Sequence, residues 1–202
     1  MTRPFRLGLT GSIGMGKSTT AGFFAEQGVP IWDADAAVHR LYAPGGLAAT
    51  ALAQDFPAAV QNGAVNRAAL ESCIAADPSD LSRLEALIHP LVAADRQHFL
   101  TAARAPLVVL DIPLLFETGL DADTDATLLV TAPPSLQLAR VMARPGMTQS
   151  QFDLLVARQM PDAEKRKRAM HIVETLSLDA TRAYVQSLLI YLRSTMTNGI
   201  HP

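Results

Sequence analysis

Short runs of apolar residues alternate along the chain with longer stretches in which apolar positions recur every three or four residues. The short runs have the length of buried strands, and the longer stretches have the period of amphipathic helices. Strands are predicted at 5–10, 29–32, 107–110, 127–131 and 171–174. Helices are predicted at 18–27, 135–143 and 179–196, with another that opens at 148. Strands that alternate with helices predict an α/β fold built on a parallel sheet.

The chain between the second and third predicted strands differs from the rest. From Asp35 to Arg104 it is rich in alanine and mostly helical in pattern. Ser79 can cap a helix whose apolar positions 81, 84, 87 and 88 share one face. His89-Pro90 then interrupts or bends that helix, because proline removes a backbone donor. A crossover between parallel strands does not need so many residues, so the region is predicted to be a helical insertion.

Composition excludes several classes of protein. The 202 residues are 49% hydrophobic and 18% charged, which excludes an intrinsically disordered chain. The net charge of −2 gives no basic footprint for nucleic acid or a membrane surface. No apolar run approaches 18 residues, and a single cysteine, Cys73, is typical of a reducing cytosol. We expect a cytoplasmic protein, monomeric or weakly self-associating, without nucleic-acid or membrane partners.

The clearest chemical signal is the segment GSIGMGKS at 11–18, which matches G-x-x-x-x-G-K-[ST] between a predicted strand and a predicted helix. Its glycines let backbone N–H groups converge on phosphate oxygens at a helix N-terminus. Lys17 can reach the β- and γ-phosphates, and the Ser18 hydroxyl can ligate Mg²⁺. A glycine-rich turn with a chance lysine is the weaker interpretation. The residues expected to hold the nucleotide are Gly11, Ser12, Ile13, Gly14, Met15, Gly16, Lys17, Ser18 and Thr19.

Three aspartates are candidates for the chemistry around this phosphate-binding loop (P-loop). Asp33 follows the second strand, at the carboxyl edge where α/β sheets bind ligands, and could accept a proton from an attacking hydroxyl. The alternative is a helix cap, which is the favoured interpretation for Asp35. Asp111 ends the third strand and could hold a water on Mg²⁺, or simply form a turn.

Arginines after the fourth strand could neutralise phosphate charge, since the guanidinium group is planar and has several donors. Arg140 is the candidate we select. Arg144 and Arg158 could join it if 144–160 folds over the nucleotide, and Thr148 to Gln151 reads as a capping box within that segment. The basic run 165–168 is expected to be a solvated helix face.

A P-loop indicates that the chain binds a nucleotide but does not identify the reaction. No N-K-x-D segment occurs, so the guanine-reading element of a GTPase is missing, and the chain is short for a motor ATPase. A small kinase with a helical acceptor lobe and a mobile lid fits better. Two alternatives stay open: a kinase of another metabolite, and a nucleotide-binding regulator that transfers no phosphate. Asp33 argues against the regulator, because binding alone needs no base.

Several sequence blocks follow one another along the chain: 8–19, Asp33-Ala34-Asp35 with His39, 89–92, 111–117, 137–140, Arg144 and Arg158-Gln159. Together, in this order, they resemble the dephospho-CoA kinase family. They run over about 7–173, and the D-A-D and P-L-L-F-E blocks are more specific than the P-loop. Departures are Ser12, where the family often has glycine, and Met170 and Thr175, where it usually has aspartate and asparagine. The last two lie where such kinases tend to touch adenine, so adenine contacts are left unassigned.

This resemblance implies a function and a division of the chain. The family transfers the γ-phosphate of ATP to the ribose 3′-hydroxyl of dephospho-CoA, the last step of coenzyme A synthesis. By resemblance, Asp33 is the base, Lys17 and Arg140 neutralise phosphate charge, and ATP is the phosphate donor. The Mg²⁺ used with ATP is expected to be held by Ser18 and Asp111, as their positions indicate. A P-loop NTPase core, with a parallel sheet flanked by helices, would comprise 1–34 and 106–202. The helical domain for dephospho-CoA would be 35–105, and the lid about 144–160.

Overall fold

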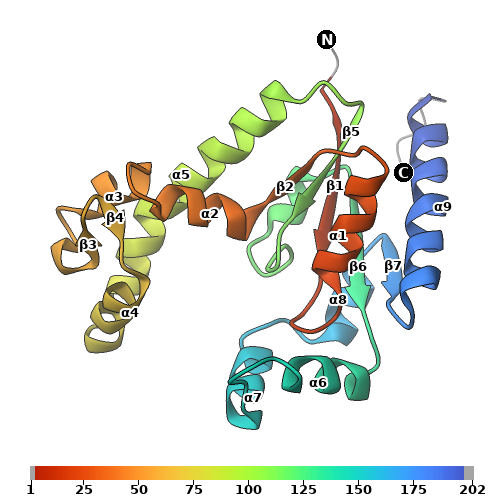
Figure 1. The fold of residues 1–202 in the computed structure, drawn as a ribbon. Helices are drawn as coiled ribbons and strands as arrows, with labels where there is room; N and C mark the ends of the chain where they lie inside the picture. The colour runs from red at the N-terminus through yellow and green to blue at the C-terminus, as the bar shows by residue number, and fades with distance from the viewer. Residues whose placement is uncertain (1–2, 198–202) are drawn as a thin grey trace. The chain divides into compact units, whose positions relative to one another are not determined.

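The computed structural model describes residues 3–197, which divide into two compact units (Figure 1). The first unit comprises the described parts of 1–32 and 103–202, and the second comprises 33–102. Each unit has its own hydrophobic core. Within the described residues, none of the helices combines the length and apolar character needed to cross a membrane.

A five-stranded sheet in the order β2-β5-β1-β6-β7 forms the centre of the first unit. Strand β1 pairs in parallel with both β5 and β6, and β6 pairs in parallel with β7. The predicted α/β fold is therefore confirmed. All five strands lie at the runs expected from the sequence: β1 (Phe5–Thr10), β2 (Ile31–Asp33), β5 (Leu107–Asp111), β6 (Ala126–Thr131) and β7 (His171–Glu174).

Two helices, α1 (Lys17–Glu26) and α9 (Leu178–Thr197), pack together on the side of the sheet where the main core lies (Figure 1). Leu7 and Leu9 of β1 point into this core. On the other side, a Cβ on Gly8 would lie 2.9 Å from Leu115, so the segment after β5 lies close against that face. The remaining elements of the unit are η2 (Leu120–Asp123), α6 (Pro134–Met142), α7 (Gln149–Ala157) and α8 (Asp162–Arg168).

The second unit is mainly helical, as expected for an insertion. Its core gathers Leu52, Phe56 and Ile88 from three segments. Pro90 lies inside a continuous helix, so of the two expected effects, an interruption or a bend, the interruption is wrong. The elements are α2 (Ala34–Tyr42), α3 (Leu47–Leu52), η1 (Pro57–Ala59), β3 (Val60–Gln61), β4 (Ala64–Val65), α4 (Arg67–Ala76) and α5 (Asp80–Ala102).

A small hairpin in this unit was not predicted. Strands β3 and β4 pair antiparallel around Asn62 and Gly63, whose φ angles are 50° and 73°. Two successive residues with positive φ form the tight turn that matches the twist of paired strands. An Asn-Gly dipeptide is the strongest short-range sequence signal for such a hairpin, because both residues adopt positive φ readily.

Candidate active site

The P-loop turns sharply between β1 and α1. Gly14 and Gly16 have φ of 76° and 93°, a region that side-chain-bearing residues rarely adopt. A Cβ on Gly14 would also lie 2.5 Å from Cγ2 of Val141. Gly16 is the N-cap of α1, so the helix begins at Lys17. Because the first N–H groups of a helix have no partner within it, this end of α1 can bind an anion.

Two of the predicted residues, Lys17 and Asp111, are in contact at the head of α1. The Nζ atom of Lys17 lies 2.5 Å from Oδ1 of Asp111, and Asp111 is only 2% exposed. A buried carboxylate needs such a partner, because burial of an unpaired charge is costly. Ser18 is exposed in the first turn of α1. The structure thus brings a cation and a buried carboxylate together at the head of α1.

Two glutamines hold the Ile13 peptide of the P-loop from both sides. Nε2 of Gln137, on α6, donates to the Ile13 carbonyl at 2.8 Å. The Ile13 N–H donates to Oε1 of Gln159 at 3.1 Å. Neither glutamine was identified as a contact of the loop from the sequence, although both lie in the blocks that carry the family resemblance. Their contacts anchor the loop to α6 and to the segment that follows α7.

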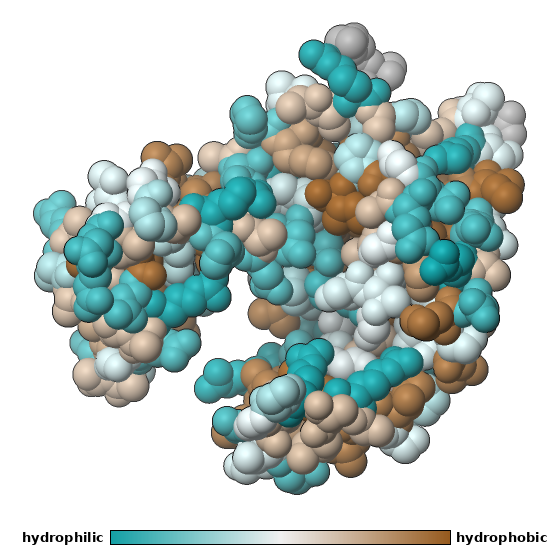
Figure 2. All heavy atoms as spheres, viewed as in Figure 1, coloured by the Kyte–Doolittle hydropathy of each residue, from teal (hydrophilic) through white to brown (hydrophobic). Residues whose placement is uncertain are grey.

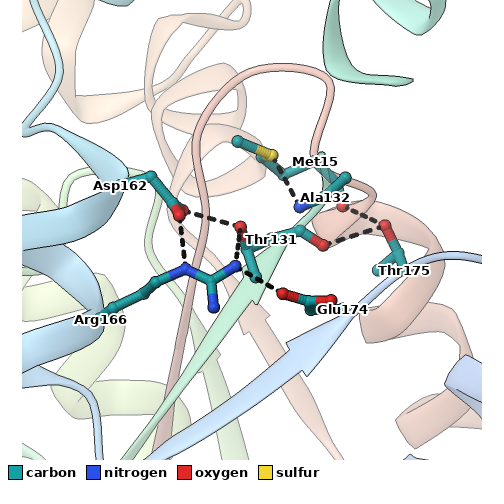
Figure 3. Close-up of polar contacts among 7 residues, drawn as sticks. All are labelled: Met15, Thr131, Ala132, Asp162, Arg166, Glu174 and Thr175. Atoms are coloured by element: carbon teal, nitrogen blue, oxygen red, sulfur yellow. Dashed lines mark hydrogen bonds and ion pairs between the residues drawn. The ribbon is translucent and has the colours of Figure 1, made fainter. Parts of the chain in front are cut away.

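Arg140 is bound to Thr175 rather than directed into solvent. Its Nη1 and Nη2 atoms donate to the hydroxyl and the carbonyl of Thr175 at 2.7 and 2.6 Å. The same hydroxyl lies 2.8 Å from the Met15 carbonyl. Figure 3 shows Thr175 beside Met15 and the end of β6. Arg140 is therefore one contact away from the P-loop.

A second polar group lies at the same end of β6 (Figure 3). The Thr131 hydroxyl donates to Asp162 at 2.8 Å, and Asp162 accepts from Nε of Arg166 at 2.7 Å. Arg166 also reaches Glu174, at 2.7 Å. This network fixes the start of α8 against the ends of β6 and β7.

The prediction that the basic run 165–168 is a solvated helix face is wrong for Lys165. Lys165 is 0% exposed, and its Nζ lies 2.9 Å from Oε1 of Glu117. Arg168 pairs with Asp121 at 2.8 Å and donates to the Phe116 carbonyl. Because α8 packs against the segment after β5, one face of the run points inward. Lys167 and Arg168 are exposed, as expected for a solvated face.

Glu117 joins this segment to the residues after α7. It accepts from the Met160 N–H at 2.8 Å as well as pairing with Lys165. Burial raises the pKa of Glu117, but the Met160 N–H and the Lys165 ammonium outweigh it and lower the pKa below its ordinary value. Glu117 is therefore held ionised between the two segments.

Asp33 is the last residue of β2 and the N-cap of α2. Its Oδ1 atom accepts from the Ala36 N–H at 2.9 Å. Asp35 lies in the first turn of that helix and is exposed, so the prediction that Asp35 supplies the cap is wrong. An aspartate that ends a strand has the extended backbone that a cap needs, whereas Asp35 is already helical.

The segment that contains α7 is exposed and partly apolar. None of the residues of α7 is buried, and Leu154 is 59% exposed. The capping box of Thr148 and Gln151 is present as predicted. A cavity of about 370 Å³ on this segment is lined partly by Leu154, Leu155 and Arg158. In Figure 2 the spheres over α6 and α7, at the bottom of the view, mix apolar and polar side chains.

Comparison with known proteins shows the family of the chain. The family model described as dephospho-CoA kinase matches residues 5–179. The chain belongs to the dephospho-CoA kinase family. A dephospho-CoA kinase from Cereibacter sphaeroides is 65% identical over 96% of this chain and 98% of its own length. The family's activity is the ATP-dependent phosphorylation that completes coenzyme A synthesis.

Solved structures give the same fold. TT1252 from Thermus thermophilus is 39% identical with a TM-score of 0.83, over 95% of this chain and 99% of its own. A dephospho-CoA kinase from Campylobacter jejuni is 21% identical with a TM-score of 0.64, over 92% and 96% of the two chains. The second likeness supports the fold alone. Dephospho-CoA kinase membership therefore rests on the family model and the curated relatives.

Proposed function

We propose that this chain transfers the γ-phosphate of ATP to the ribose 3′-hydroxyl of dephospho-CoA and yields coenzyme A. The observation that carries the proposal is the pairing of Lys17, at the head of α1, with buried Asp111 beside a left-handed glycine turn. The 65% identity to a protein named dephospho-CoA kinase supports the choice of acceptor. The small molecules bound would then be ATP and dephospho-CoA.

The P-loop and two basic side chains would bind the phosphates. Backbone N–H groups within 11–19 are directed by the glycine turns, and Lys17 adds a charge next to them. Arg140 keeps donors to spare, because a guanidinium has five N–H groups and two of its nitrogens contact Thr175. Lys17 and Arg140 would neutralise the charge that develops on the transferred group.

The oxygen donors near Lys17 fit Mg²⁺. The Ser18 hydroxyl and the Asp111 carboxylate are of the kind that magnesium prefers when it also binds phosphate. A bound Mg²⁺ would offset the negative charge of the phosphates. Lys17 would then exchange its pairing with Asp111 for one with phosphate, which leaves the carboxylate for the metal.

Asp33 would act as the general base. Oδ1 caps α2, so Oδ2 can accept the proton of the 3′-hydroxyl. The hydroxyl oxygen forms a bond to the γ-phosphorus as the bond from that phosphorus to the bridging oxygen of ADP breaks. The products are coenzyme A, ADP and a proton first held on Asp33.

Two further parts of the chain would bind the acceptor and exclude water from the site. Residues 35–105 would receive dephospho-CoA, and about 144–160 would close as a lid that carries Arg144 and Arg158. The exposed apolar side chains of α7 favour a surface that another group covers. We place the reaction in the cytoplasm and expect a monomer or a weak homo-oligomer.

The direct test measures ADP release from the purified protein with ATP and Mg²⁺, with and without dephospho-CoA. We expect release that depends on the acceptor and a product whose mass equals that of coenzyme A. If ATP binds and dephospho-CoA stays unchanged, the acceptor is wrong and nucleosides and phosphorylated metabolites should be tried next. Release that is independent of any acceptor would favour an ATPase or a regulator.

A further inference from the structure

Thr175 makes more polar contacts through one hydroxyl than a surface threonine does. It follows β7 and is 5% exposed. Its Oγ1 accepts from Arg140 at 2.7 Å and lies 2.8 Å from the Met15 carbonyl and 3.3 Å from the Thr131 carbonyl. A hydroxyl has one hydrogen, so the shorter distance assigns the donated bond to Met15. In Figure 3, dashed lines join the Thr175 hydroxyl to Met15 and to Thr131.

The backbone of Thr175 is held as firmly as its side chain. Its N–H donates to the Thr131 carbonyl at 2.9 Å, which continues the pairing of β7 with β6. Its carbonyl accepts the second Arg140 bond, at 2.6 Å. The hydroxyl is thus presented to the P-loop from the rigid end of a sheet.

The side chain also packs against the turn that precedes Lys17. A Cβ on Gly16 would lie 3.1 Å from Oγ1 and 3.2 Å from Cγ2 of Thr175. Met15 and Gly16 are the two residues before Lys17. Thr175 therefore limits where these two peptides, and hence the start of α1, can lie.

We propose that Thr175 is a positioning residue that places the P-loop and Arg140 together for ATP. Through one hydroxyl it bonds to the Met15 carbonyl and to Arg140, the two sides between which the phosphates would bind. Its effect is exerted through these groups and needs no contact with substrate. The inference deepens the proposed function and rests on it for the roles of Lys17 and Arg140.

The test compares Thr175→Val, which keeps the shape and removes the hydroxyl, with Thr175→Ser, which keeps the hydroxyl. We expect T175V to weaken binding of a non-hydrolysable ATP analogue about 5- to 10-fold, the loss typical of one hydrogen bond. T175S should bind within roughly twofold of the wild type. In turnover, T175V should raise KM for ATP and leave KM for dephospho-CoA unchanged.

Thermal unfolding of each variant separates this role from a general loss of structure. If T175V does not fold, Thr175→Ala removes the same hydroxyl without crowding the site and is measured instead. Wild-type ATP binding in the variant that lacks the hydroxyl would overturn the proposal. So would an equal loss in T175S, since the methyl group would then be the part that matters.

The binding measurement does not depend on the acceptor. A wild-type protein that binds the ATP analogue but leaves dephospho-CoA unchanged would overturn the proposed function alone. Weaker binding of the ATP analogue by T175V in that case would still support the positioning role.

Discussion

Lys165 carries a fully buried charge, and Glu117 is the carboxylate that compensates it. Its Nζ lies 2.9 Å from Glu117. Glu117→Gln leaves the ammonium buried without a counter-charge, so we expect the free energy of unfolding to fall by about 3 kcal/mol. Lys165→Met should cost less, because Glu117 keeps some exposure to water. Denaturant unfolding of both variants measures the difference.

The double variant E117Q/K165M and an exposed pair serve as controls. The double variant should recover part of the loss, since it removes both charges. Lys167 pairs with Glu164 at the surface, so Lys167→Met should change stability by only about 0–1 kcal/mol. An E117Q protein as stable as the wild type would mean that Lys165 gains no stability from this partner.

His171 predicts a pH dependence of stability. Its ring lies 5.8 Å from that of Tyr191, edge to face, and burial lowers its pKa. The unfolded chain, with a pKa near 6.5, then binds a proton more readily than the folded one. Above the pKa of the unfolded state, His171 is neutral in both states and its contribution to the free energy of unfolding is complete. As the pH falls towards the lower pKa of the folded state, protonation favours the unfolded chain and that contribution is lost. His171→Asn should remove that part of the slope in unfolding measured between roughly pH 7 and 5.

At this scale, residues in a local motif could be identified from the sequence and residues defined by packing could not. Lys17 and Ser18 stand in a fixed spacing, and Asp111 ends a visible apolar run. The burial of Lys165 depends on α8 packing against a segment more than forty residues away, and a run of four basic residues gives no sign of it. Thr175 was noticed only as a departure from the family, because its contacts come from three distant segments.

Among the elements, the P-loop turn makes the sharpest prediction. Gly14→Ala would force a side chain into a left-handed conformation and towards Val141. We expect ATP binding roughly tenfold weaker or worse, since the left-handed conformation alone costs about 1–2 kcal/mol. Calorimetric titration with an ATP analogue measures the change.

Gly22 provides a matched control within α1. A Cβ there meets no atom within 4 Å, and the residue lies inside the helix. Gly22→Ala should therefore bind ATP normally and gain about 0.5–1 kcal/mol of stability. Equal loss of binding in both variants would show that the turn geometry at Gly14 is not the cause.

Long periodic elements were predictable and short ones were not. The strands of the main sheet lie at the apolar runs, because burial on both faces leaves a continuous signal. The β3–β4 hairpin has two residues per strand, too few for any period. The helix α5 is not interrupted at Pro90, because its packing within the unit maintains the helix across the proline.

For the whole molecule, the sheet order places strands that are far apart in the sequence next to one another. β5 pairs beside β1 although about one hundred residues separate them, and the register aligns Leu9 with Asp111. β2 neighbours β5, so the strands that end at Asp33 and Asp111 are adjacent in the sheet. The carboxyl ends of parallel strands share an edge, and α/β sheets bind ligands at that edge. The sequence alone predicts that edge but not the strand order.

The measurement that tests the account most directly is turnover by Asp33→Asn with dephospho-CoA and ATP. Asparagine caps a helix as well as aspartate, so α2 should be preserved while the base is lost. We predict a fall in kcat of roughly 10²–10⁴ with unchanged affinity for ATP. Asp35→Asn, two residues away and exposed, should retain wild-type turnover. A D33N enzyme with wild-type kcat would contradict the assignment of Asp33 as the base.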